Sequence, residues 1–185
     1  MSLIHLMKII GIGGTLRKGS FSKALLFAAQ KLTPKGVVIE ITEIGDFPLY
    51  NPDIPVPKNV QEFKNKIRSA DAILFSTAEY NYSVPGVLKN AIDWASRPYG
   101  DNSFDQKPAA IMSESTGLIS GSRAAYHLRQ IMVMLNSPVL TQPELMVPQA
   151  SDKFDKEGNL TDEHTKEKIK ALLEALSKWA ERLKQ

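Results

Sequence analysis

The chain has 185 residues, of which 43% are hydrophobic and 23% are charged, and its formal net charge at pH 7 is +3. This size and composition are typical of a globular protein with one sizeable core. The chain contains no cysteine, which excludes disulfides, thiolate metal sites, iron–sulfur clusters and cysteine nucleophiles. The basic residues are dispersed among acidic ones, so the charge argues against nucleic-acid binding and predicts only weak attraction of anionic ligands.

No apolar run is long enough to span a bilayer, and no apolar leader follows basic residues at the amino end. We therefore expect a cytoplasmic protein that does not bind membranes. Residues 1–185 are expected to form a single domain. Within it, residues 1–6 precede a second methionine, Met7, and are expected to be a non-native or disordered leader.

Short apolar runs that end at small or polar residues alternate with stretches of helical periodicity. Such runs are typical of buried parallel strands. A helix is predicted to begin near Ser20, and one near Ser83 is predicted to use that serine as its N-cap with Pro85 in the first turn. The strands are predicted at 6–12, 37–42, 72–76, 109–113 and 138–147. The other helices are predicted at 59–69, at 120–135 and from 161 onward.

The alternation of strands and helices predicts an α/β protein with a parallel sheet covered on both faces. Right-handed crossovers leave few topologies for such a sheet. Its ligands bind beyond the carboxyl ends of the strands, where the strand order reverses. The sequence therefore places the function in three loops, at 13–20, 77–83 and 113–121.

The first of these loops resembles two known nucleotide motifs but completes neither. Residues 11–16 approach the dinucleotide fingerprint, yet Leu16 stands where its third glycine belongs. Residues 14–19 approach the phosphate-binding P-loop, but Lys18 precedes the last glycine instead of following it. Both motifs are therefore excluded.

What remains in this loop is a set of groups that suit an anion. Thr15, Ser20 and Ser22 offer hydroxyls, and Arg17 offers a guanidinium, next to the amino end of a helix. Ser20 also fits a plain N-cap, and Arg17 alone also fits a solvated surface side chain. Taken together, the groups favour a phosphate site.

The second loop, 77–83, carries two tyrosines and an asparagine directly after a buried strand. The tyrosines fit either local packing against Pro85 and Trp94 or a platform for a flat heteroaromatic ring. Residues 113–117 are small and polar, as a loop must be if a ring lies close to its backbone. On their own they also fit a generic turn.

Residues 14–22 and 79–94 together resemble the NADPH-dependent FMN reductase family, in particular its quinone, chromate and azo-dye reductases. Residues 96–98 and 126–131 resemble the same branch, and the resemblance extends over the chain from Met7. It implies a flavodoxin-like three-layer sandwich, with helices on both faces of a five-stranded parallel sheet of order 2-1-3-4-5.

The resemblance also implies bound FMN and assigns residues to it. The phosphate is expected to contact Thr15, Arg17, Ser20, Phe21 (through its N–H) and Ser22. The isoalloxazine is expected to be bordered by Ala78, Glu79, Tyr80, Asn81 and Tyr82, with Ser113, Ser115 and Gly117 along its other edge and the ribityl chain.

Three of these positions depart from the usual residues of the family. Thr15 replaces a serine and keeps the hydroxyl, while Ala78 replaces a proline and keeps the backbone donors. Ser22 replaces an asparagine, so the resemblance makes Ser22 the weakest of the expected phosphate contacts.

The implied activity is FMN-dependent oxidation of NADPH or NADH, with ping-pong hydride transfer through flavin N5 to small acceptors such as quinones, flavin, azo dyes or chromate. No side chain is expected to act as a catalytic residue and no metal is expected. His127 is expected at a packing face or a subunit contact. The family also implies a homodimer or homotetramer.

Two other functions fit the same fold. A flavodoxin-type electron carrier would bind FMN and a protein partner without oxidising NAD(P)H, but the sequence pI of about 9.0 and Arg17 argue against it. A regulator that binds no flavin is the second alternative.

Overall fold

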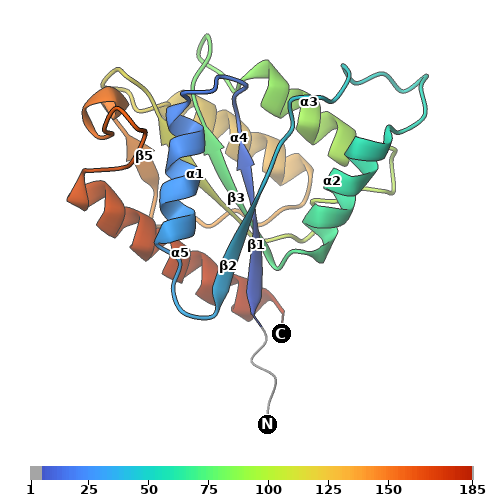
Figure 1. Cartoon of the computed structure of the whole chain (residues 1–185). Coiled ribbons are helices and arrows are strands. Elements are labelled where there is room, and N and C mark those ends of the chain that lie inside the picture. The colour runs from blue at the N-terminus through green and yellow to red at the C-terminus, as the bar shows by residue number, and fades with distance from the viewer. Residues whose placement is uncertain (1–5, 185) are drawn as a thin grey trace.

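The structure, a computed structural model, describes residues 6–184. Five strands form one parallel sheet in the order β2-β1-β3-β4-β5, which confirms the predicted topology (Figure 1). The strands are β1 (Met7–Gly13), β2 (Val37–Thr42), β3 (Ala72–Thr77), β4 (Ala109–Glu114) and β5 (Leu145–Val147). The helices are α1 (Phe21–Lys31), α2 (Lys58–Ser69), α3 (Gly86–Ala95), α4 (Ser122–Met134) and α5 (Glu163–Leu183), with a short 3-10 turn at Ala150–Asp152.

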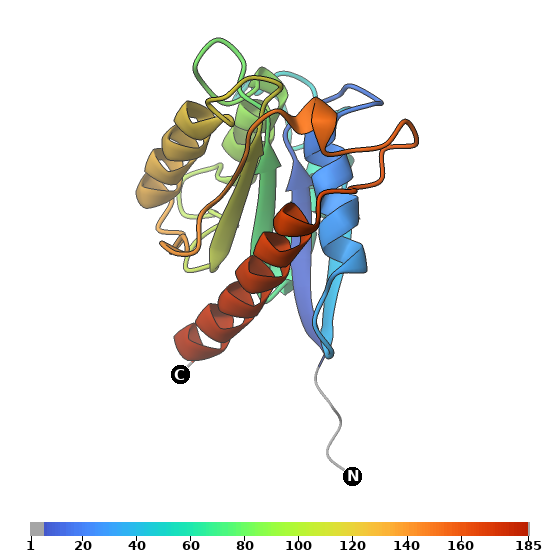
Figure 2. The ribbon, with the colours of Figure 1, turned by 90° about the vertical axis from the view of Figure 1, so that its left-hand side faces the viewer.

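Helices cover both faces of the sheet, so the molecule has two separate hydrophobic cores. Helices α1 and α5 lie on one face, and α2, α3 and α4 lie on the other (Figures 1 and 2). Ile9 points into the first core and Ile10 into the second, as alternation along a strand requires. Every residue of β3 and β4 is buried, which explains why these strands read as continuous apolar runs.

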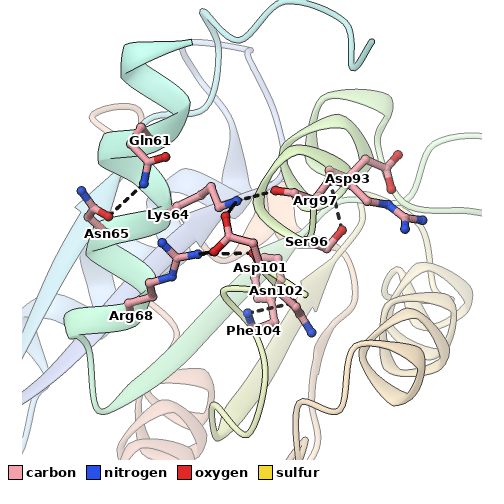
Figure 3. Close-up of polar contacts among 10 residues, drawn as sticks. All are labelled: Gln61, Lys64, Asn65, Arg68, Asp93, Ser96, Arg97, Asp101, Asn102 and Phe104. Carbon is pink, nitrogen blue, oxygen red and sulfur yellow. Dashed lines mark hydrogen bonds and ion pairs between the residues drawn. The ribbon is translucent and has the colours of Figure 1, made fainter. Parts of the chain in front are cut away.

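A polar cluster ties α2 to the connection between α3 and β4 (Figure 3). The side chain of Lys64 is completely buried, and its ammonium donates to Asp101 Oδ2 at 2.6 Å and to the carbonyl oxygen of Arg97. Arg68, one turn further along α2, pairs with the same carboxylate. The cluster therefore attaches the segment between α3 and β4 to α2.

The fifth strand is much shorter than the predicted range of 138–147. Only Leu145–Val147 pairs with β4 as a strand, and Val139 contributes an isolated bridge to Ala109. Pro138 and Pro143 lack the N–H group that a continuous ladder needs, which accounts for the interruption.

The predicted N-cap of α3 is wrong. The helix begins at Gly86 with Pro85 in the cap position, and no side chain caps it. Ser83 instead pairs with Tyr80 in a small antiparallel bridge, and its Oγ lies 3.0 Å from His127 Nδ1. The serine therefore interacts with the preceding loop and with α4, and not with the amino end of α3.

Of the expected leader, residues 1–5 lie outside the described part of the chain, and Leu6 is exposed. None of the helices formed by residues 6–184 combines the length and the apolar character that a bilayer span requires.

Candidate cofactor site

The carboxyl ends of β1, β3 and β4 meet at one edge of the sheet, and the loops that follow them enclose a cavity of about 180 Å³. Because β2 lies beyond β1 and β4 lies beyond β3, the strand order reverses here, as expected for a ligand site. The cavity is lined by Thr15, Arg17, Ser20, Phe21, Ala78, Glu79, Tyr80, Glu114, Ser115 and Thr116.

The first wall is the loop between β1 and α1. Gly14 N–H donates to the carbonyl of Ser76 at 2.8 Å, and a Cβ on this glycine would lie only 3.2 Å from the Thr77 hydroxyl. The loop therefore runs tightly along the end of β3. Ser20 caps α1 by accepting from the N–H of Lys23 at 3.3 Å, so the positive end of the helix faces the cavity together with Arg17.

The second wall is a tight turn at the end of the loop after β3. Tyr80 and Ser83 exchange two backbone hydrogen bonds of 3.0 Å, and the intervening Asn81 and Tyr82 have φ of 49° and 67°. Two consecutive residues with positive φ define a turn of type I′. Of this turn, Tyr80 belongs to the cavity lining, and Asn81 and Tyr82 at its tip do not.

The base of this loop is fastened to α4. The Glu79 carboxylate accepts from Arg123 Nη1 at 2.7 Å and from the backbone N–H of Arg123 at 3.1 Å, at the first turn of α4. The Arg123 guanidinium in turn lies 3.8 Å from the centroid of the Tyr82 ring. An acidic side chain at a helix amino end is favourable, so the loop and α4 brace one another.

The third wall contains a buried acid, Glu114, at the end of β4. Its side chain is 4% exposed, and Oε1 accepts from Ser22 Oγ at 3.0 Å. Ser22 Oγ also lies 3.1 Å from Ser20 Oγ. Burial raises the pKa of the Glu114 carboxyl, while the hydrogen bonds from Ser22 and the charge of Arg17 oppose that rise.

A larger groove of about 470 Å³ lies elsewhere, between α1 and residues 157–160. Its polar rim is engaged internally, since Lys31 Nζ donates to Asn159 Oδ1 at 3.2 Å. The groove is remote from the carboxyl ends of the strands, so we place the functional site in the smaller cavity.

Residues 7–152 match the sequence model of NADPH-dependent FMN reductase. The chain belongs to this family. Across 181 aligned residues, 96% of the chain and 97% of the relative, it is 48% identical to an NAD(P)H-dependent FMN reductase of Pseudomonas aeruginosa. It is 44% identical to an NAD(P)H:quinone oxidoreductase of Solanum tuberosum, covering 100% of the chain and 98% of the relative.

Among solved structures, the chain is similar to FerB of Paracoccus denitrificans, described as a flavoenzyme NAD(P)H:(acceptor) oxidoreductase. The TM-score is 0.87 and the sequence identity is 35%, over 95% of this chain and 98% of that one.

The structure brings together most, but not all, of the residues that the resemblance to FMN reductases assigns to the flavin. The cavity lining contains Thr15, Arg17, Ser20, Phe21, Ala78, Glu79, Tyr80 and Ser115. The remaining five are Ser22, Asn81, Tyr82, Ser113 and Gly117. Ser22 donates a hydrogen bond to Glu114, and Asn81 and Tyr82 form the tip of the turn. Ser113 Oγ donates to the Ser120 carbonyl at 2.8 Å. The Gly117 carbonyl accepts from Ser115 Oγ at 3.0 Å.

Trp94 has a different aromatic partner from the two tyrosines of the loop after β3. Trp94 meets Tyr50 edge-on, with ring centroids 5.0 Å apart, whereas Tyr80 and Tyr82 are 50% and 67% exposed. Their exposure favours a ligand platform over local packing for Tyr80, which belongs to the cavity lining.

Glu114 and Thr116 also line the cavity but were not among the predicted site residues. The available signal was an acidic residue directly after the apolar run of β4.

Proposed function

We propose that the protein is an FMN-dependent NAD(P)H oxidoreductase that reduces small acceptors, quinones foremost. The observation that carries this proposal is the convergence of Arg17, Ser20 and the amino end of α1 on one cavity at the switch point of the sheet. The family membership and the names of the relatives, FMN reductase and quinone oxidoreductase, support the same activity.

The groups present suit FMN. A guanidinium, two hydroxyls (Thr15 and Ser20) and a helix amino end form a donor set for a phosphate. The cavity of about 180 Å³ is smaller than a typical small-molecule pocket of roughly 300–1,000 Å³. It therefore has room for the phosphate and ribityl end, while the ring would rest against the loop of residues 78–82.

When bound, FMN supplies the hydride chemistry. The task of the chain is to bind and orient it. The tight approach of Gly14 to β3 fixes the phosphate loop, and the Glu79–Arg123 pair fixes the loop that would border the ring. Such fixed walls favour a reactive alignment between flavin and nicotinamide. We propose that NAD(P)H and the acceptor use the same place in turn, and we assign no catalytic side chain.

The wider acceptor range of flavin, azo dyes and chromate is part of the proposal, as are the choice between NADPH and NADH and a cytoplasmic location. We further propose a homodimer or homotetramer. The exposed side chains of Tyr126, Val133 and Met134 on α4 support such assembly.

The decisive experiment is anaerobic addition of NADPH, and separately NADH, to the protein reconstituted with FMN. The visible flavin band should bleach, and a quinone added afterwards should restore it. A flavin band that persists with both nicotinamides would contradict the enzyme and favour an electron carrier. A protein that acquires no flavin spectrum from FMN would favour the flavin-free alternative.

A further inference from the structure

Glu114 is an acid in a cavity that otherwise suits an anion. The residue lies in the cavity wall and is 4% exposed, and its Oε1 accepts from Ser22 Oγ at 3.0 Å. The Ser22–Ser20 contact of 3.1 Å connects it to the N-cap of α1, where the phosphate of FMN would bind. The carboxyl and the phosphate would therefore be close neighbours.

The charges around Glu114 give it little compensation. From the β1–α1 loop, Arg17 is the cation that acts on it. From the loop after β3, Glu79 and Tyr80 share the cavity, but Glu79 is paired with Arg123.

Within residues 6–184, the other elements packed against Glu114 direct no compensating cation toward the carboxyl. On α1, the ammonium of Lys23 is engaged by Glu43. On β5, the residue that pairs with Glu114 is the apolar Val147, and at the start of α4 it is Gly121 that meets the Glu114 backbone.

A bound phosphate would compete with Glu114 for Arg17. Two like charges close together disfavour each other, and protonation of the buried carboxylate would relieve that repulsion. A protonated carboxyl, in contrast, has an O–H that can donate to Ser22 Oγ or to a phosphate oxygen. The neutral form of Glu114 is therefore favoured when the phosphate site is filled.

We propose that Glu114 takes up a proton from solvent when FMN binds, so that this residue makes FMN affinity fall as pH rises. The inference rests on the proposed function, since it assumes that the phosphate of FMN occupies this cavity. In this binding equilibrium, the protein with an ionised Glu114 takes up FMN and one proton from solvent, and the product is the complex with a neutral carboxyl. A bound phosphate raises the pKa further from its already raised value. Affinity is therefore highest below the pKa of the free protein and declines as pH increases above it.

The test compares the wild-type protein with Glu114→Gln, which is permanently neutral and nearly the same size. FMN dissociation constants are measured by flavin fluorescence between about pH 5 and about pH 9, which brackets the ordinary and a raised carboxyl pKa. The wild-type Kd, divided by that of the variant, should increase by up to about tenfold per pH unit. The division removes the titration of the phosphate itself. Glu157→Gln, on the exposed surface, should behave as wild type.

Two further readouts separate proton uptake from a merely structural role. Riboflavin lacks the phosphate, so its ratio of dissociation constants should stay nearly flat with pH. Calorimetry in buffers of different ionisation enthalpy should show that the wild type takes up more protons on binding FMN than Glu114→Gln does, by up to about one.

Parallel pH curves with equal proton uptake, or a riboflavin slope equal to that of FMN, would overturn the role of Glu114 and leave the proposed function standing. If neither the wild type nor Glu114→Gln bound FMN at any pH, the proposed function would be overturned, and this inference with it. Thermal unfolding of both proteins verifies that each is folded under the conditions used.

Discussion

The ammonium of Lys64 lies 2.6 Å from Asp101 Oδ2, although the lysine side chain has no exposed surface. A buried charge is tolerated when it is paired and hydrogen-bonded, and the carbonyl of Arg97 completes this environment (Figure 3). The contact joins α2 to the connection that leads into β4, and β4 ends at the cavity.

Asp101→Asn should destabilise the protein because it leaves the buried ammonium of Lys64 without a counter-charge. We expect the free energy of unfolding to fall by up to about 3 kcal/mol, with water reducing the loss because Asp101 is 45% exposed. Lys64→Met, which removes the buried charge itself, should cost less. Denaturant unfolding measures both, with Asp53→Asn on an exposed loop as the control.

The same pair gives a pH signature. The hydrogen bond from Lys64 lowers the pKa of Asp101. Its stabilising contribution is therefore complete above the ordinary aspartate pKa and is lost as pH falls through the lowered, folded-state value. The stability gap between wild type and Asp101→Asn should close at acid pH, and a gap independent of pH would contradict this account.

Arg17→Ala should weaken FMN binding through the loss of a charge-assisted hydrogen bond to the phosphate. The expected loss is about 1.5–3 kcal/mol, or roughly one to two orders of magnitude in Kd. Riboflavin should be affected much less. Arg182→Ala, on the exposed face of α5, is the matched control. An unchanged FMN affinity would show that the phosphate binds elsewhere.

Gly121→Ala should disturb the end of β4. Gly121 has φ of 70°, and a Cβ there would lie 2.7 Å from the backbone oxygen of Glu114. Gly158→Ala is the comparison, because Gly158 also has a positive φ, 83°, but has open space around it. Its loss of stability therefore measures only the cost of placing alanine at positive φ, about 1–2 kcal/mol. Denaturant unfolding should show a larger loss in the free energy of unfolding for Gly121→Ala than for Gly158→Ala. Equal losses would mean that the backbone near β4 moves to accommodate the added methyl group at no cost.

Sequence reasoning located the central strands within a residue because β3 and β4 are buried on both faces and therefore carry continuous apolar runs. It overextended the fifth strand, where prolines interrupt pairing. It also misassigned Ser83, since the choice between capping α3 and closing the Tyr80 turn depends on His127, which is far along the chain.

The same limit applies to the site. Strand topology and local chemistry were enough to identify the three loops and the Arg17–Ser20 wall. Glu114 was missed because its hydrogen-bond partner, Ser22, lies 92 positions away, and nothing local to β4 reveals that contact. Contact with the flavin stays a prediction for all of the assigned residues, both those in the cavity lining and those outside it, such as Asn81 and Ser113.

The walls of the cavity belong to opposite layers of the molecule. Ser20 and Arg17 depend on α1, which packs with α5, whereas Glu79 depends on α4 on the other face of the sheet. Detachment of either layer would separate the walls of the cavity, so a half-unfolded molecule would lose the proposed flavin site. FMN bound at the proposed site would link the two layers. At one hundred times its Kd it would stabilise the native state by about 2.7 kcal/mol, and its release would coincide with the loss of whichever layer separates first.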